Sequence, residues 1–282
     1  MITSGAKPKA TSYEYGRAYQ LHQAEKFRQR QSNRWRIRIA LAFELFDRFV
    51  LPRLSREPRG TVVVDVGCSV GTFAIEFSKR GFQAFGVDFD PAAIEIATEL
   101  SREERASARF VCQDVSDFSQ TQGKTIDVAV CFDIFEHLHD DELGSLLQSL
   151  KRNLSAGGHL IFHTYPSQYG YIFQNGGLRL PLIPLAWLGA GLFSRLARSY
   201  AAALDGAWIL ARGASHRESI KLDGHCNLLT VERVGDILRR SGFEIVSLES
   251  ANLYGLSPAA GRIFSRQPLA HQNIYGVARL NG

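Results

Sequence analysis

The sequence predicts an α/β protein with a mostly parallel sheet that is flanked by helices. Short β-branched runs alternate with amphipathic segments from about residue 62 to residue 163, and the alternation resumes near residue 230. This spacing is typical of parallel strands joined by right-handed helical crossovers. The chain has 282 residues, of which 45% are hydrophobic and 22% charged. Such a composition excludes a largely disordered chain and a small disulfide scaffold.

The expected elements follow one another at regular spacing. Residues Val62 to Val66 form a β-branched run that ends at Gly67, typical of a strand buried on both faces. A helix is predicted to begin at Pro91 with Asp90 as its N-cap. The other predicted elements are a helix over 71–80, strands over 83–88, 109–112, 126–131 and 159–163, and a leucine-faced helix over 143–154 whose connection ends at Gly157 and Gly158.

The N-terminal region, the C-terminal region and a break in the strand–helix alternation complete the predicted organisation. Residues 13–54 have a helical pattern, and the strand–helix alternation pauses between Tyr165 and His225. Near the C-terminus, Thr230 is expected to cap a helix that Gly242 ends. The predicted parts are a basic N-terminal helical arm over 1–54, a ligand-binding core over 55–164, a helical lid over 165–225, and a completion of the sheet over 226–282 that includes strands over 243–248 and 272–280.

The net charge of +5 comes from the N-terminal arm, because Met1 to Arg38 hold nine basic and two acidic residues. A basic arm can bind nucleic acid, an anionic substrate or a membrane surface, or it can be a solvated helix face. The sequence holds no zinc finger or RNA-recognition motif, so nucleic acid is not expected as a partner. The oligomeric state cannot be inferred from the sequence.

Cysteine usage and hydropathy predict a cytoplasmic location, with peripheral membrane contact as an alternative. The four cysteines form no C-x-x-C pair, which argues against a zinc site and suits a reducing compartment. The apolar run from Leu180 to Phe193 is too short to span a bilayer and is broken by prolines. The expected lid mixes tryptophans and arginines with leucines, as helices in a membrane interface do, although a core-facing stripe explains the same pattern.

The clearest motif is the turn after the first strand, Asp65-Val66-Gly67-Cys68-Ser69-Val70-Gly71. Gly67 and Gly71 let the backbone bend sharply and approach a ligand closely. The glycines are four residues apart and an acid precedes them, so the turn is not the dinucleotide fingerprint G-x-G-x-x-G. A pyrophosphate is therefore disfavoured against a ligand that makes close contacts with polar backbone groups.

Two further acids follow the next strands. Asp88 ends the second strand, where a carboxylate can accept hydrogen bonds from both hydroxyls of a ribose. Asp114 follows the third strand, at the place where an adenine amino group would lie. Each is alternatively an ordinary turn-forming acid.

Together these elements resemble the class I S-adenosylmethionine-dependent methyltransferases over about residues 61–163 and again from Gly224 onward. The stretches C-F-D-I-F-E-H-L from Cys131 and G-H-C-N-L-L-T from Gly224 are similar to turns of the ubiquinone-type O-methyltransferases, a subgroup with methyltransferase domains of the 11/23 kind. Ser69 stands where this family usually has glycine. The resemblance implies S-adenosylmethionine as the cofactor and a Rossmann-like, seven-stranded, mostly parallel sheet in the order 3-2-1-4-5-7-6, with a lid between strands 5 and 6.

The resemblance also implies roles for individual residues. The loop from Asp65 to Gly71 would hold the methionine part of the cofactor, Asp88 the ribose, and Asp114 the adenine. No metal ligand is expected. The implied cofactor-binding set is Asp65, Gly67, Cys68, Ser69, Gly71, Asp88, Phe89, Asp114, Val115, Phe132 and Asp133.

A hydroxyl acceptor needs a base, and histidines are the first candidates because imidazole titrates near neutral pH. His137, after the fourth strand, is the first choice and His225 the second; each is alternatively a packing or turn residue. His163 and Tyr165 are also expected to face the site. The predicted function is methyl transfer to a hydroxyl oxygen of an apolar, secondary-metabolite-like small molecule. The alternatives are C- or N-methyl transfer, lipid modification with the same cofactor, a nicotinamide-dependent oxidoreductase, and a non-catalytic S-adenosylmethionine-binding partner protein.

Overall fold

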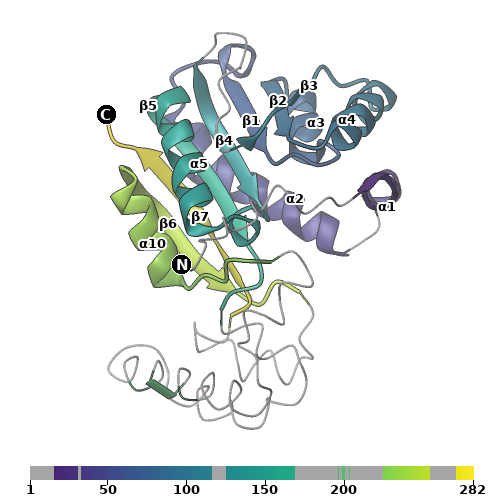
Figure 1. Cartoon of the computed structure of the whole chain (residues 1–282). Coiled ribbons are helices and arrows are strands. Elements are labelled where there is room, and N and C mark those ends of the chain that lie inside the picture. The colour runs from purple at the N-terminus through teal and green to yellow at the C-terminus, as the bar shows by residue number, and fades with distance from the viewer. Residues whose placement is uncertain are drawn as a thin grey trace, which may run out of the picture.

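The computed structural model describes residues 16–30, 33–115, 125–168, 225–254 and 271–282, together with residues 196, 199, 200 and 203. Its strands form one seven-stranded sheet in the order β3-β2-β1-β4-β5-β7-β6 (Figure 1). The predicted fold class and strand order are confirmed. The strands are β1 (Val62–Val66), β2 (Gln83–Asp88), β3 (Arg109–Cys112), β4 (Ile126–Phe132), β5 (Leu154–Thr164), β6 (Phe243–Ala251) and β7 (Asn273–Leu280).

Two of the helices begin where the sequence supplies a cap. The Asp90 carboxylate accepts a hydrogen bond from the Ala92 backbone N–H at 2.9 Å, and the Thr230 hydroxyl accepts one from the Arg233 N–H at 3.2 Å. Both contacts satisfy amides that a helix start leaves without partners. The larger helices are α1 (Gly16–Gln29), α2 (Asn33–Leu45), α3 (Thr72–Lys79), α4 (Pro91–Glu103), α5 (Asp140–Asn153) and α10 (Val231–Arg240).

The strand register brings the functional turns to one edge of the sheet. Strands β1 to β5 pair in parallel, and β7 runs antiparallel between β5 and β6. Asp88 lies level with Cys112, and Phe132 lies level with His163. Because parallel strands end on the same side, the turns that follow β1, β2, β3 and β4 lie next to one another, as ligand sites of such sheets require.

The sheet is buried on both faces by apolar side chains that alternate along the strands. Val64 of β1 packs into a core with Leu147 of α5 and Leu238 of α10, whereas its neighbour Val63 packs with Phe46 and Phe77 on the other face. Successive side chains of a strand point to opposite faces, so a continuous valine run serves both layers. Figure 1 shows α5 and α10 side by side over one face, with α2 behind the sheet.

The N-terminal region is two helices, and the prediction of one helical run over residues 13–54 is wrong on this point. Helix α1 ends at Gln29, and Arg30 adopts a left-handed φ of 47°, which cannot continue an α-helix. Helix α2 then leads into a π-helical turn at Phe46–Val50.

The prediction for residues 143–158 is also corrected. Leu154 begins strand β5 instead of ending helix α5, and it pairs with Ile126. The pairing register then shifts, and Gly157 lies inside β5 with a φ of 74°. The two glycines therefore belong to an irregularity within the strand, where a left-handed residue is needed.

Two arginines of α1 pair with acids of α4. Arg28 forms a two-pronged ion pair with Glu103, with its closest contact at 2.7 Å, and Arg17 contacts Glu95 at 2.6 Å. These pairs are exposed, so each contributes little free energy. They nevertheless hold α1 against α4 beside an apolar contact around the buried Phe27.

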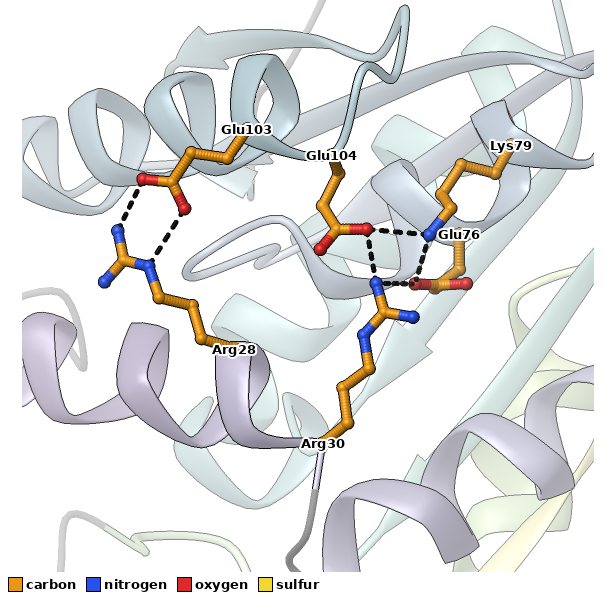
Figure 2. A network of polar contacts seen from close by, with 6 residues as sticks. All are labelled: Arg28, Arg30, Glu76, Lys79, Glu103 and Glu104. Atoms are coloured by element: carbon orange, nitrogen blue, oxygen red, sulfur yellow. Dashed lines mark hydrogen bonds and ion pairs between the residues drawn. The ribbon is translucent and has the colours of Figure 1, made fainter.

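The residue that follows α1 joins a second charged network, which Figure 2 shows. Arg30 contacts Glu104 and lies 3.9 Å from the Glu76 carboxylate of α3, and Lys79 contacts Glu104 at 2.8 Å. At this point the basic arm faces acids of the same chain, Glu76 and Glu104.

The predicted lid over residues 165–225 lies almost entirely outside the described residues, and it remains a prediction together with the division into four parts. The apolar stripe expected on it includes Leu196 and Tyr200; both are helical, Leu196 is exposed and Tyr200 is partly buried. No helix in the described part of the chain has the length and hydropathy that a membrane span requires.

We predict opposite effects for two glycine-to-alanine substitutions. At Gly276 in β7, an added Cβ would lie 2.1 Å from the backbone oxygen of Ser247, which cannot move without disturbing the sheet. Gly276→Ala should therefore lower the free energy of unfolding by about 2–3 kcal/mol. At Gly144 in α5 nothing lies within 4 Å, so Gly144→Ala should raise it by roughly 0.5–1 kcal/mol. Denaturant titration checks both, and equal effects would contradict the packing described for β7.

Candidate functional site

The turn after β1 is a tight bend in the left-handed region. Gly67, Ser69 and Gly71 have φ values of 67°, 47° and 80°. The backbone N–H groups of Gly67 and Cys68 both donate to the Val87 oxygen, at 2.8 and 3.0 Å, which fixes the bend against β2. Ser69 takes the left-handed conformation at the position where the resembled family has glycine, so the departure from the pattern costs backbone strain and leaves the shape of the bend intact.

Asp88 joins this bend to the end of β2. Its carboxylate is buried, with Oδ2 accepting from the Ser69 N–H at 2.8 Å and Oδ1 from the Asp90 N–H at 3.0 Å. Burial raises the pKa of Asp88, and the backbone N–H groups of Asp90, Ser69 and Phe89 oppose that rise. A carboxylate offers about four acceptor positions, so Asp88 retains acceptor capacity beyond its contacts with the backbone. This is the acceptor capacity that two ribose hydroxyls would use.

Helix α1 closes over the same bend through Gln20. The Gln20 side chain is 3% exposed; its Oε1 accepts from the Ser69 hydroxyl at 2.8 Å, and its Nε2 donates to Asp90 Oδ2 at 2.9 Å. Gln20 thus links the β1 turn to the start of α4. Sequence reasoning missed this residue, since nothing in the pattern of α1 separates Gln20 from Gln23 or Gln29.

Asp65 lies at the base of the bend and is almost fully buried. Its Oδ2 accepts from the Ala74 N–H at 3.2 Å, near the start of α3. Burial raises the pKa of Asp65 to about 7, and the Ala74 amide and Arg38 only partly oppose that rise. The side chain therefore changes its charge near neutral pH, beside the loop that the family resemblance assigns to the methionine part of the cofactor.

Beyond β4, Asp133 is the centre of a charged network. Arg38 of α2 contacts Asp133 Oδ2 at 2.9 Å, and His163 Nδ1 forms a hydrogen bond to Oδ1. Burial would raise the pKa of Asp133, but Arg38 and His163 hold it well below its usual range. On its other side, His163 Nε2 lies 2.9 Å from the Asn273 Oδ1, and the Asn273 amide donates to the Ala251 oxygen. Both ring nitrogens of His163 thus have a side-chain partner within hydrogen-bonding distance.

Glu136, His137 and His225 form a second group at this edge. The rings of His137 and His225 have centroids 4.8 Å apart, and one donor atom from each of the three residues lies within 4.8 Å of the others. Backbone hydrogen bonds hold the two segments together, because the N–H groups of Cys226 and Asn227 donate to the backbone carbonyl oxygen of Glu136 at 2.8 and 3.0 Å. The two histidines expected to serve as bases are therefore neighbours, although they come from segments far apart in sequence.

The other predicted site residues lie around these groups. Phe132 is buried and stacks on the His163 ring at 5.4 Å, next to Phe73. Tyr165 packs edge-on against Tyr254 at 5.2 Å, which adds an aromatic wall beside His163. The remaining members are the buried Cys68 and Val115 and the partly exposed Phe89 and Asp114, which follow β2 and β3.

Three residues of the described site were not identified from the sequence. Gln20, Arg38 and Asn273 come from α1, α2 and β7, outside the stretch that carries the motifs. Arg38 stands in the series Arg34, Arg36, Arg38, which gives no sign of which arginine turns inward. Asn273 is a fully buried polar residue at the start of an apolar strand, and that contrast is a signal that could have been used.

Comparisons with known proteins define the class. Residues 34–248 match the family described as Methyltransferase domain, which is more than half of the chain. The chain therefore belongs to this methyltransferase-domain family. Among curated relatives, a ubiquinone biosynthesis O-methyltransferase of Acinetobacter baylyi is 27% identical over 129 residues, which are 44% of this chain and 53% of the relative. The chain thus spans about half the length of the curated relatives it matches.

Solved structures support the fold. The plantazolicin methyltransferase BpumL in complex with S-adenosylhomocysteine has a TM-score of 0.56 and 17% identity, and the match covers 97% of this chain and 94% of that one. Magnesium protoporphyrin IX methyltransferase from Synechocystis, also with bound S-adenosylhomocysteine, has a TM-score of 0.50 and 16% identity over 87% and 85% of the two chains. At these identities the likeness shows a shared fold alone.

We predict that Asp65 makes stability fall as the pH rises. Its folded pKa of about 7 lies above the ordinary value of 3.8, so the folded state retains a proton that the unfolded chain releases. Its contribution is fully present below pH 4 and lost as the pH approaches 7. The free energy of unfolding of Asp65→Asn minus that of the wild type should therefore rise over this window, by at most about 4 kcal/mol. Denaturant titrations between pH 4 and 8 measure the difference, and a difference independent of pH would contradict the burial of this charge.

Proposed function

We propose that the chain transfers a methyl group to a hydroxyl oxygen of a small, apolar, phenol-like acceptor. When bound, S-adenosylmethionine supplies an electrophilic methyl group; the acceptor oxygen forms the new C–O bond as the C–S bond breaks, which leaves S-adenosylhomocysteine and releases the hydroxyl proton. The chain must orient the acceptor, exclude water and accept that proton. The named activity of the curated relatives, ubiquinone biosynthesis O-methyltransferase, supports oxygen as the acceptor atom.

The cofactor would be held by the β1 turn and the acids of the neighbouring strands. Asp88 would accept the two ribose hydroxyls, Asp114 would meet the adenine amino group, and the bend from Gly67 to Gly71 would take the methionine part. The Asp88 carboxylate fits this ligand, because it keeps acceptor capacity beyond its backbone contacts. A dinucleotide is less suited, since the bend lacks a third glycine and an acid stands at its base.

The observation that carries the choice of oxygen is the contact between His137 and His225, with His137 close enough to Asp133 to help lower its pKa. An amine acceptor can attack through a neutral lone pair, but a hydroxyl reacts well only when its proton is removed. We assign this role to the histidine pair, with His137 in the turn that follows β4. Aromatic side chains close to this turn suit a planar acceptor; they are Phe132, Tyr165 and Tyr254.

The cofactor assignment is tested by Asp88→Ala. We expect this substitution to weaken S-adenosylhomocysteine binding by a few kcal/mol, because two ribose hydroxyls lose their acceptors. Isothermal titration calorimetry measures the effect, and Asp236→Ala on the exposed side of α10 is the control, which should bind as the wild type does. Thermal melting confirms that the variant is folded. Unchanged affinity in Asp88→Ala would refute the ribose assignment.

The acceptor assignment is tested with radiolabelled methyl transfer to matched alkyl phenols, alkyl catechols and alkyl amines. We expect transfer to the hydroxyl compounds, and we expect His137→Ala to lower turnover roughly 10²-fold to 10⁴-fold while S-adenosylhomocysteine affinity stays unchanged. His22→Ala, on the exposed face of α1, is the matched histidine control. Transfer to amines alone, or wild-type turnover of His137→Ala, would contradict the proposal.

A further inference from the structure

The group Glu136, His137 and His225 has the chemistry of a metal site. Two imidazoles and one carboxylate are the ligand set that first-row divalent ions take when positions must stay open for a substrate. The three donor atoms lie within 4.8 Å of one another. Ligands around a zinc ion are about 3.3 Å apart, so small side-chain rotations would close the shell. A metal at this place is not expected from the sequence, because the two histidines are brought together only by the fold.

The surroundings of Glu136 orient its carboxylate toward this role. Glu136 is 1% exposed; its Oε2 accepts from the Thr164 hydroxyl at 2.8 Å, and its Oε1 accepts from the Tyr165 N–H at 3.4 Å. Metal-binding side chains are usually held in this way by a surrounding layer of hydrogen bonds. These two contacts leave other acceptor positions of the carboxylate available.

The charge balance favours a cation at this place. Asp133 lies three residues before Glu136 and has Arg38 and His163 as its partners. Within the described part of the chain, no lysine or arginine forms an ion pair with Glu136 itself. Arg38 acts on Glu136 only from a distance, because its direct contact is with Asp133. A buried carboxylate without a cation in direct contact is costly, and a dication held by His137 and His225 would supply one.

We propose that Glu136, His137 and His225 bind a divalent transition metal ion of the zinc class, whose open positions take two neighbouring oxygen atoms of the acceptor. The proposal rests on the proposed function and narrows its substrate class to acceptors with vicinal oxygens, such as catechols. The histidine pair would then promote proton loss through the ion, because a hydroxyl on a bound dication is more acidic and gives up its proton before water is excluded and the oxygen attacks. The histidines would then act as ligands.

Metal titration tests the site without cofactor or acceptor. The full-length protein, stripped with EDTA, is titrated with ZnCl₂ and separately with MgCl₂ by calorimetry. We expect one zinc ion per chain and much weaker magnesium binding, since imidazole ligands disfavour magnesium. His137→Ala and His225→Ala should each lose roughly 100-fold or more in zinc affinity, whereas His22→Ala should bind as the wild type does. Zinc affinity that is unchanged in both cluster variants would overturn the proposal.

Two further measurements test the metal site without relying on the folding of the variants. Cobalt(II) added to the wild type should give visible absorption bands that zinc abolishes, and their absence would overturn the proposal even if a variant fails to fold. Catechol methylation should fall at least tenfold after EDTA treatment and return with zinc. Full activity of the stripped enzyme would overturn the metal site and leave the proposed O-methylation standing. Zinc binding without transfer to any hydroxyl acceptor would support the metal site and contradict the proposed O-methylation.

Discussion

The burial of carboxylates at the carboxyl edge of the sheet is the constraint on which the site depends. Three buried acids, Asp65, Asp88 and Glu136, and the partly exposed Asp133 lie in β1, in β2 or in the turn after β4. Removal of such groups from water is costly unless donors or cations meet them. Backbone amides of the β1 turn and of α3 meet Asp88 and Asp65, and Arg38 with His163 meets Asp133. The bend after β1 supplies a backbone donor to Asp88, and the position of α2 supplies Arg38 to Asp133.

This arrangement divides the edge into two chemically different halves. The half built from β1 and β2 is rich in backbone donors and carboxylate acceptors, which suits a nucleoside with hydroxyl and amino groups. The half beyond β4 brings imidazoles, arginine and aromatic rings together from α2, β4, β5, β7 and the segment before α10. A methyl group held where the halves meet would face the groups that activate an acceptor, which is the requirement of methyl transfer.

The first half can be predicted well from the sequence and the second half only in part. Apolar runs, with the rule that ligands bind beyond parallel strand ends, are enough to bring Asp65, Asp88 and the β1 turn together. The inward turn of Arg38, the Gln20 link and the contact between the two histidines depend on packing between segments that are distant in sequence. Local sequence patterns do not encode such contacts. The end of α1 at Arg30 is likewise not predictable, because no glycine or proline marks it.

The central claim is that the edge beyond β1, β2 and β3 holds the adenosyl cofactor. Hydrogen–deuterium exchange with and without saturating S-adenosylhomocysteine tests it most directly, because a bound ligand slows exchange where it closes the backbone off from water. The account predicts slower amide exchange in residues 67–71, 88–90 and 114–115. Exchange in β6 and β7, the last two strands in the sheet order, should be unchanged. Unaltered exchange in all three of those turns, with protection confined to other segments, would contradict it.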